Sequence, residues 1–283
     1  MSRYIKLNLD LEEIDLYHFS DLHVGSKAFH EDAFKEVRED VIDNPKAKVI
    51  FNGDATEGKT IDSSHFNPEG LKPGQLNIQK QADYFTELWR PIADKTISFG
   101  EGNHDMYLMP NYDVMHNVCK DLNMEAVRGG YQTWVDINEG ELILFNWHGR
   151  PALPRGAKDP IQREANQRAW LKNRLEGLGS AHAMYMSHTH ACLIQPPIEK
   201  YSLIPSGENV KGRYFKESEY MIGGEKFIPV DARWYVNTGT FRRTGMFDYT
   251  DYSEIAGYAP APIACTKTKI RNGKIKKIKK VIL

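Results

Sequence analysis

The sequence contains little cysteine, no long apolar run and almost no net charge. Its three cysteines, Cys119, Cys192 and Cys265, share no CxxC spacing, which argues against a disulfide framework or a zinc–thiolate site. No run approaches the roughly 20 apolar residues that a membrane-spanning helix needs, and the N-terminal stretch lacks the apolar core of a signal peptide. With a net charge of −1, any affinity for a polyanion must come from local clustering or from bound metal. These absences predict a cytoplasmic protein without membrane contact.

The chain is long enough for one large α/β domain or for two smaller ones, and we predict a single domain over residues 1–283. Short apolar runs predict strands, while apolar residues spaced three or four apart predict helices. The predicted strands are 14–19, 48–51, 96–99, 131–137, 141–145, 183–186 and 234–236, and the predicted helices are 28–42, 76–92, 114–122 and 161–178. This mixture predicts an α/β fold.

Polar side chains closely follow five of these strands. In open α/β sheets, ligands bind beyond the carboxyl ends of the strands, so these side chains are expected along one edge. Each cluster alone is also explained by a turn or a helix cap, but five in succession indicate a shared site. The clusters are Asp-x-His at 21–23, Gly-Asp at 53–54, Gly-Asn-His-Asp at 102–105, His-Gly at 148–149 and His-Thr-His at 188–190.

The donor types in these clusters indicate the kind of ion that they suit. Oxygen and imidazole nitrogen dominate and no thiolate occurs, which favours Mn²⁺, Fe or Zn²⁺ over a soft metal. Residues two apart point the same way, so Asp21 and His23 can bind one ion together. Two glycines belong to the same segments. Gly53 is expected to permit close backbone approach, and Gly102 to permit a sharp turn at positive φ.

This series of motifs resembles the calcineurin-like metallophosphoesterase superfamily, in particular its nuclease and phosphodiesterase branches, which include phage-encoded members. The resemblance covers roughly residues 14–245. It implies an αββα fold, in which two β-sheets form a sandwich flanked by helices and the motifs lie along one edge. Gly53-Asp54 precedes Ala-Thr-Glu-Gly, where phosphoprotein phosphatases have Asp-Arg-Gly, so the arginine that they use against phosphoserine is absent. Ser187 stands where relatives usually have glycine, a small-for-small change that should be tolerated.

The resemblance implies that seven side chains hold two divalent metal ions. Mn²⁺ is the expected ion, with Fe, Zn²⁺, Ni²⁺ or Mg²⁺ as alternatives. His104 would contact a phosphate oxygen and protonate the leaving group, and Asp105 would orient His104. The implied ligands are Asp21, His23 and His190 for the first ion, Asn103, His148 and His188 for the second, and Asp54 as the bridge between them.

The implied activity is two-metal hydrolysis of a phosphate ester, with a phosphodiester of nucleic acid or a nucleotide as the expected substrate. The alternatives are a phosphomonoesterase acting on a small molecule or a phosphoprotein, and a catalytically silent phosphate-binding scaffold. The complete ligand set argues against the scaffold, because loss of activity usually coincides with loss of ligands. Arg150, close to His148, is expected to bind substrate phosphate, with Arg155 and Lys158 extending a cationic rim. The oligomeric state is left open.

Two excursions from the predicted core are expected to shape the substrate site. The loop at 56–75 and the excursion at 206–230 would form walls beside the metal ions. Tyr214, Phe215 and Tyr220 would then stack on bases, or would instead pack the excursion onto the domain. The first reading makes single-stranded DNA or RNA the expected partner.

The C-terminal segment predicts a basic β-hairpin near 266–283. Lysines alternate with isoleucines around an Asn272-Gly273 turn, so that one face is apolar and the other is coated with lysine. Charged residues protect a sheet edge from pairing with other chains, which explains the lysines without nucleic acid.

Overall fold

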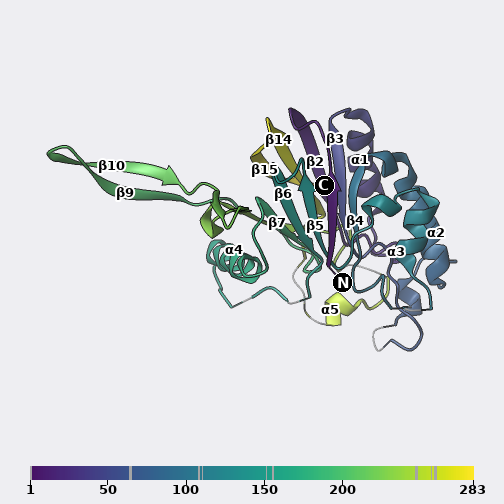
Figure 1. Cartoon of the computed structure of the whole chain (residues 1–283). Coiled ribbons are helices and arrows are strands. Elements are labelled where there is room, and N and C mark those ends of the chain that lie inside the picture. Colours follow the sequence, from purple (N-terminus) through teal and green to yellow (C-terminus); the bar gives the residue numbers. More distant parts are fainter. Residues whose placement is uncertain are drawn as a thin grey trace.

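Figure 1 shows the computed structural model of the chain, in which two β-sheets lie together with helices on their outer sides. The structure describes residues 2–63, 66–107, 109, 111–150, 152–154, 156–245, 248–255, 257 and 260–283. Each main sheet contains parallel and antiparallel strand pairs. The chain is therefore a mixed α/β protein, as predicted, and its arrangement is compatible with an α/β sandwich.

The first main sheet has five strands, and three of the predicted polar clusters follow its strands β2, β3 and β4. β2, β3 and β4 run parallel, whereas β14 runs antiparallel to both β2 and β15. Because parallel strands end at the same edge of a sheet, the residues that follow β2, β3 and β4 meet there. The strand order is β15 (Lys274–Ile282), β14 (Ala264–Arg271), β2 (Glu13–Phe19), β3 (Ala47–Asn52) and β4 (Thr96–Gly100).

The second main sheet has six strands, and the remaining two clusters follow β6 and β7. β6, β7 and β13 run parallel to one another. The edge strands β1 and β8 were not predicted, because their sequences mix polar and apolar residues without a clear strand signal. The order is β1 (Ser2–Leu7), β5 (Gln132–Ile137), β6 (Leu142–Trp147), β7 (Ala183–Met186), β13 (Trp234–Thr238) and β8 (Cys192–Gln195).

Three apolar cores hold these layers together. One contains buried residues of both sheets, such as Leu16 of β2 and Leu144 of β6. A second joins the five-stranded sheet to three helices, where Phe34 stacks on Trp89. The third joins the six-stranded sheet to the fourth helix through Leu171 and Leu175. The helices are α1 (Glu31–Asp43), α2 (Ile78–Trp89), α3 (Val114–Asp121) and α4 (Pro160–Glu176).

Side-chain caps set the helix starts that periodicity alone placed only approximately. His30 and Asn77 accept backbone hydrogen bonds and begin α1 and α2 two or three residues later than predicted. Asp159 caps α4, which begins at Pro160. No helix in the described ranges is both long and apolar enough to cross a membrane. The shorter helices are η1 (Pro68–Gly70), η2 (Arg90–Lys95), η3 (Glu125–Val127), η4 (Val230–Ala232) and α5 (Tyr252–Ile255).

The loop at 56–75 lies beside the first polar cluster, as predicted, although residues 64 and 65 fall outside the described ranges. Thr56 forms a bridge with Val24, and Leu71 forms one with Ser26. These contacts attach both ends of the loop to the segment that follows His23. The loop therefore borders the strand-end edge.

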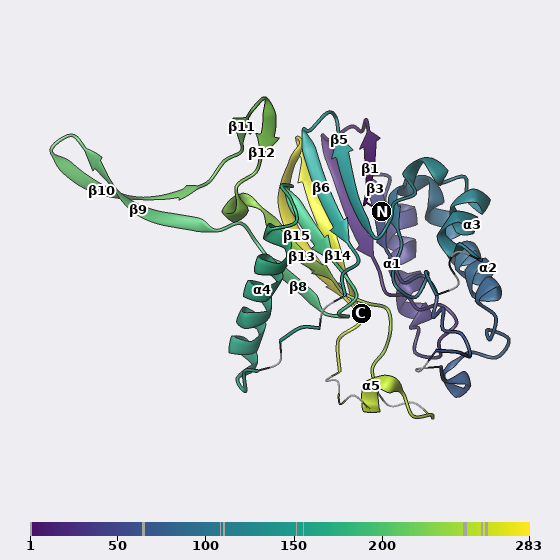
Figure 2. The ribbon, with the colours of Figure 1, turned by 60° about the horizontal axis from the view of Figure 1, so that its bottom comes forward.

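The predicted excursion at 206–230 is wrong in its start and in its position. It begins at Glu199 and contains two hairpins, of which the longer, β9 with β10, points away from the body (Figures 1 and 2). β8 carries the chain away from the strand-end edge, because its partners run from Thr238 back to Tyr235. The excursion therefore does not wall the site, and the proposed stacking residues Tyr214, Phe215 and Tyr220 lie on the hairpins. The strands are β9 (Glu199–Ser206), β10 (Asn209–Lys216), β11 (Tyr220–Ile222) and β12 (Glu225–Phe227).

The C-terminal hairpin is confirmed. β14 and β15 pair antiparallel, and the turn between them places Asn272 and Gly273 at positive φ. β15 forms the edge of the five-stranded sheet. Its Ile278 is buried, while Lys276 and Lys277 are exposed. The lysines therefore coat an edge strand, as predicted.

One buried histidine lies between the sheets and belongs to no predicted site. His18 of β2 is fully buried, and its ring stacks on Tyr185 of β7 with the ring centroids 3.6 Å apart. Burial lowers the pKa of His18 to about 3, because a charged imidazole would lose its hydration there. In the unfolded chain the same group takes up a proton near pH 6.5.

This difference predicts that acid destabilises the fold through His18. The unfolded state binds the proton and the native state resists it, so stability is lost as the pH falls from about 6.5 towards 3. Between pH 7 and pH 5, the free energy of unfolding of the wild type should fall by about 2 kcal/mol more than that of His18→Leu, since one pKa unit corresponds to about 1.4 kcal/mol. Urea unfolding at several pH values measures this extra loss. A difference between the two proteins that does not change with pH would contradict it.

Candidate metal centre

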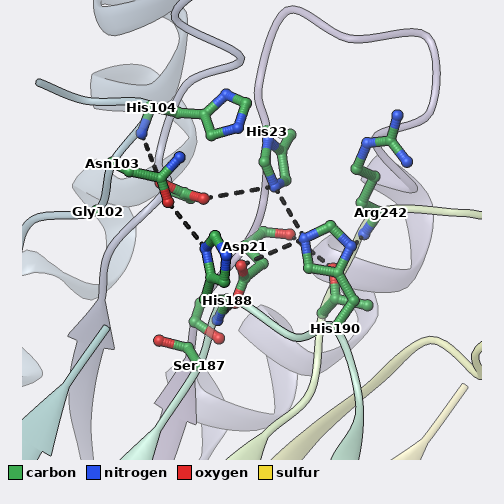
Figure 3. A network of polar contacts seen from close by, with 12 residues as sticks. Asp21, His23, Gly102, Asn103, His104, Ser187, His188, His190 and Arg242 are labelled. Atoms are coloured by element: carbon green, nitrogen blue, oxygen red, sulfur yellow. Dashed lines mark hydrogen bonds and ion pairs between the residues drawn. The ribbon is translucent and has the colours of Figure 1, made fainter. Parts of the chain in front are cut away.

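The polar clusters meet where the parallel strands of both sheets end (Figure 3). Their donor atoms form groups in which every atom lies within 4.8 Å of the others. Two groups match the two predicted metal positions, and the third introduces Glu57, which was not predicted. The groups are Asp21, His23 and His190; Asp54, His148 and His188; and His23, Glu57 and His104.

The first predicted position joins the segments after β2 and β7. Nε2 of His23 lies 3.2 Å from Nε2 of His190, which lies 3.4 Å from Oδ1 of Asp21. Asp21 is fully buried, and its Oδ1 accepts no hydrogen bond from the described residues. A buried carboxylate oxygen in this state is costly unless a cation satisfies it. The group therefore fits a metal ion.

The second predicted position joins the segments after β3, β4, β6 and β7. Nε2 of His148 lies 3.1 Å from Oδ2 of Asp54 and 3.2 Å from Oδ1 of Asn103. Nδ1 of His188 lies 2.8 Å from the same Asn103 oxygen. The amide oxygen of Asn103 thus faces both imidazoles, as Figure 3 shows for His188.

The spacing of these atoms supports the same interpretation. Donors that each lie about 2.1 Å from one ion are roughly 3 to 3.5 Å from one another. The contacts of both groups, from 2.8 to 3.4 Å, fall close to this range. Oδ2 of Asp54 also lies 3.7 Å from Nε2 of His23, so its carboxylate stands between the groups.

Five of the predicted ligands adopt a left-handed backbone conformation. Only nine non-glycine residues in the described part of the chain have positive φ, so this edge holds most of them. Each such residue costs on the order of 1–3 kcal/mol, and such residues cluster at functional sites. The five are Asp21 (52°), His23 (52°), Asp54 (57°), His188 (71°) and His190 (57°).

Two glycines allow this packing. A Cβ atom on Gly53 would lie 2.5 Å from the backbone nitrogen of Gly102, which confirms the close approach predicted for Gly53. A Cβ atom on Gly102 would lie 2.1 Å from Oδ1 of Asp54. The prediction of positive φ at Gly102 is wrong, because its φ lies outside that region. Glycine is needed there because the Asp54 carboxylate occupies the space of a side chain.

A second layer of polar contacts orients the imidazoles. Nδ1 of His148 donates to the carbonyl oxygen of Asn52 (2.8 Å), to which the Ser187 hydroxyl also donates (2.8 Å). Nδ1 of His23 lies 3.2 Å from Oε2 of Glu57. Metal-bound histidines commonly use their second nitrogen in this way. Ser187 is thus accommodated by a hydrogen bond.

Glu57 is the main residue that sequence reasoning missed. The only signal was its place three residues after Asp54, which we read as a departure from Asp-Arg-Gly. Burial raises the pKa of Glu57, but His23, His104 and Lys59 outweigh it and hold this pKa well below its usual range. Glu57 is therefore an ionised carboxylate behind His23.

The charges in the centre favour a cation. Burial lowers the pKa of His23 to about 4, so its lone pair is free at neutral pH. Burial also disfavours the ionised form of Asp54, but His148 and His104 hold the Asp54 pKa well below its usual range. Burial lowers the pKa of His148, yet the charges of Asp54 and Asp21 raise it to about 9. The carboxylates of Asp54 and Asp21 thus stabilise positive charge at this position. A bound cation can supply that charge in place of a proton on His148.

The prediction that Asp105 orients His104 is corrected by their contacts. The Asp105 carboxylate accepts hydrogen bonds from backbone N–H groups of Asp54, Ala55 and Gly102, at 2.8 to 3.0 Å. The His104 ring instead contacts the carbonyl oxygen of Glu57 through Nδ1 (2.5 Å). Asp105 therefore shapes the loop that carries Asp54.

The predicted cationic rim is only partly described. Arg150 and Lys158 are exposed, whereas Arg155 lies outside the described residues. Arg242, which Figure 3 shows beside His190, is buried and donates to Oδ2 of Asp251 (2.6 Å). Arg150 is therefore an exposed arginine two residues after His148, which belongs to the second group.

Comparison with known proteins adds no assignment: no protein-family model matches the chain, and no curated protein matches it. The functional interpretation therefore depends on the geometry of the strand-end residues. It also depends on the motifs that carry the resemblance described above.

The contact of Gly102 with Asp54 gives a direct test of the centre. Gly102→Ala should displace the Asp54 carboxylate and weaken Mn²⁺ binding at least about tenfold, since a metal ligand must be held close to its productive position. Isothermal titration with Mn²⁺ measures this. Gly177→Ala is the matched control, because a Cβ there meets no neighbour and Gly177 adopts ordinary helical angles. Equal Mn²⁺ affinity in both variants would contradict the assignment.

Proposed function

We propose that this chain is a two-metal hydrolase of phosphate esters with the metallophosphoesterase αββα fold. The observation that carries the proposal is the position of Asp54. Its Oδ2 lies 3.1 Å from His148 and 3.7 Å from His23, so one carboxylate reaches both groups of donors. A carboxylate shared between two cations fixes their spacing, which in-line displacement at phosphorus requires.

Seven residues would hold the ions. When bound, the pair would activate water and stabilise charge on the attacked phosphoryl oxygens. Neutral imidazoles such as that of His23 add no negative charge, so the centre keeps positive charge for the phosphate. The ligands are Asp21, His23 and His190, then Asn103, His148 and His188, with Asp54 between the groups.

His104 is the proposed acid and phosphate contact. Its ring meets the His23 ring edge to face with centroids 4.6 Å apart, so it borders the first position. The Glu57 carbonyl occupies Nδ1, which leaves Nε2 to donate a proton to the leaving-group oxygen. The partial exposure of His104 leaves it accessible to substrate.

Within this class we favour a phosphodiester of nucleic acid or a nucleotide. His188 and His190 are partly exposed, so the centre lies at the surface, where an extended substrate can reach it. Arg150, two residues after His148, supplies an exposed cation close to it, and Lys158 is also exposed. The aromatic residues of the excursion no longer support this choice, because they lie away from the centre. A monoesterase and a silent phosphate-binding scaffold remain the competing functions.

Model substrates distinguish these functions. With Mn²⁺ present, the wild type should hydrolyse bis-p-nitrophenyl phosphate faster than p-nitrophenyl phosphate, and EDTA should abolish turnover. Asp54→Asn should lose essentially all activity and retain less metal, because that position reaches both groups. Faster turnover of the monoester would favour the monoesterase, and no turnover of either would favour the scaffold. Near-normal activity in Asp54→Asn, measured with metal content by mass spectrometry, would overturn the two-metal assignment.

His104→Asn should separate catalysis from metal binding. Because His104 is proposed as an acid and not as a ligand, the variant should keep its metal content while kcat falls by roughly 10²- to 10⁴-fold. The loss should be smaller for a substrate with a good leaving group, such as a p-nitrophenyl ester, than for an oligonucleotide. Loss of metal from the variant would instead make His104 a ligand, together with His23 and Glu57.

A further inference from the structure

The hairpin of β9 and β10, residues 199–216, forms an arm that stands away from the body (Figures 1 and 2). Eight cross-strand pairs hold the two strands together, from Glu199 with Lys216 to Ser206 with Asn209. At its base, Lys200 Nζ lies 2.5 Å from Glu217 and 2.7 Å from Asp231. A two-stranded ribbon is only marginally stable in water unless something packs against it.

The register gives the arm one apolar face. Directly paired residues lie on the same side of a ribbon, and successive pairs alternate between its sides. One side therefore carries Tyr201 with Tyr214, Leu203 with Gly212, and Pro205 with Val210. We call these six residues the apolar face. The other side carries Lys200 with Phe215, Ser202 with Arg213, and Ile204 with Lys211.

The apolar face is open to solvent in the single chain. Tyr214 is 73% exposed, Leu203 67%, Val210 63% and Tyr201 58%. These four side chains leave roughly 500 Å² of surface uncovered per chain, judging from the size of such side chains. A contiguous apolar patch of this size is often a binding site.

Gly212 keeps the centre of this face flat. A Cβ atom there would lie 1.6 Å from the Tyr201 hydroxyl oxygen, so the Tyr201 ring extends over the glycine. Tyr201 and Tyr214 lie together towards the base, with ring centroids 4.9 Å apart. The smaller Val210 and Pro205 lie towards the tip. The face thus has two large rings at one end, smaller groups at the other and Leu203 between them.

We propose that the apolar face binds the same face of a second copy of this chain, with the two arms antiparallel. A two-fold axis at Leu203 would place the tyrosine pair of each arm on Val210 and Pro205 of the other, so large groups meet small ones. An exposed patch of roughly 500 Å² per chain is more than half of the ~800 Å² per partner of a stable interface.

The charges favour this partner over nucleic acid. Lys216, the cation at the end of the apolar face, is already paired with Glu199 at 3.0 Å. The basic residues Lys211 and Arg213 lie on the opposite side of the arm. A polyanion would need cations beside the rings on which its bases stack. The apolar face provides rings without such cations.

Sedimentation velocity of the full chain tests the proposal. The wild type should sediment as a dimer, and Leu203→Glu should weaken dimerisation roughly 100-fold or more, because two carboxylates would meet at the axis. The matched control is Ile204→Glu, which puts the same charge on the adjacent apolar residue but on the opposite side, and it should remain dimeric. Under oxidising conditions Leu203→Cys should form an intermolecular disulfide and Ile204→Cys should not, since the native cysteines are buried.

Circular dichroism and Mn²⁺ binding establish that each variant is folded. A monomeric wild type at about 100 μM, or equal behaviour of the two glutamate variants, would overturn the proposal. So would loss of oligonucleotide binding in Leu203→Glu without any change of oligomeric state, which would assign the face to nucleic acid. This test is independent of hydrolytic activity, so its failure leaves the proposed function unaffected.

Discussion

One buried residue, Asp54, ties together the strand ends on which the candidate centre depends. Its carbonyl oxygen accepts hydrogen bonds from the backbone N–H groups of Leu22 and His23, after β2. Its own N–H donates to Asp105 and its Oδ1 accepts from the His104 N–H, both after β4. Its Oδ2 reaches towards the second sheet at His148. Displacing Asp54 would therefore disturb both groups of donors at once.

Holding the donors this way is expensive for the fold. Left-handed backbone at residues such as His188 and His190, and full burial of Asp21 and Asp54, both oppose folding. Bound metal ions would offset both costs. They would satisfy the buried carboxylates, and they would be held by side chains that the strained backbone positions. Metal binding should then also stabilise the folded chain, since ligands that bind only the native state shift the folding equilibrium.

The sequence predicted the strands that precede the polar clusters, the order of those clusters along the chain and their convergence. Apolar runs mark such strands locally, and parallel strands end at the same edge of a sheet. It could not predict the contacts that depend on the loops between segments. Glu57 reaches His23 because the segment after Gly53 runs alongside the segment that contains His23, where Thr56 bridges Val24. Asp105 binds backbone N–H groups and not His104. The arm was placed wrongly because the direction of β8, an edge strand with a weak signal, decides which end of the sheet the chain leaves.

Anomalous diffraction from crystals soaked in Mn²⁺ tests the central claim, that these side chains form a two-metal centre, most directly. The account predicts two peaks about 3.5–4 Å apart, one beside Asp21, His23 and His190 and the other beside Asn103, His148 and His188, with Asp54 between them. A single peak held by His23, Glu57 and His104, or no peak near Asp54 at all, would contradict it.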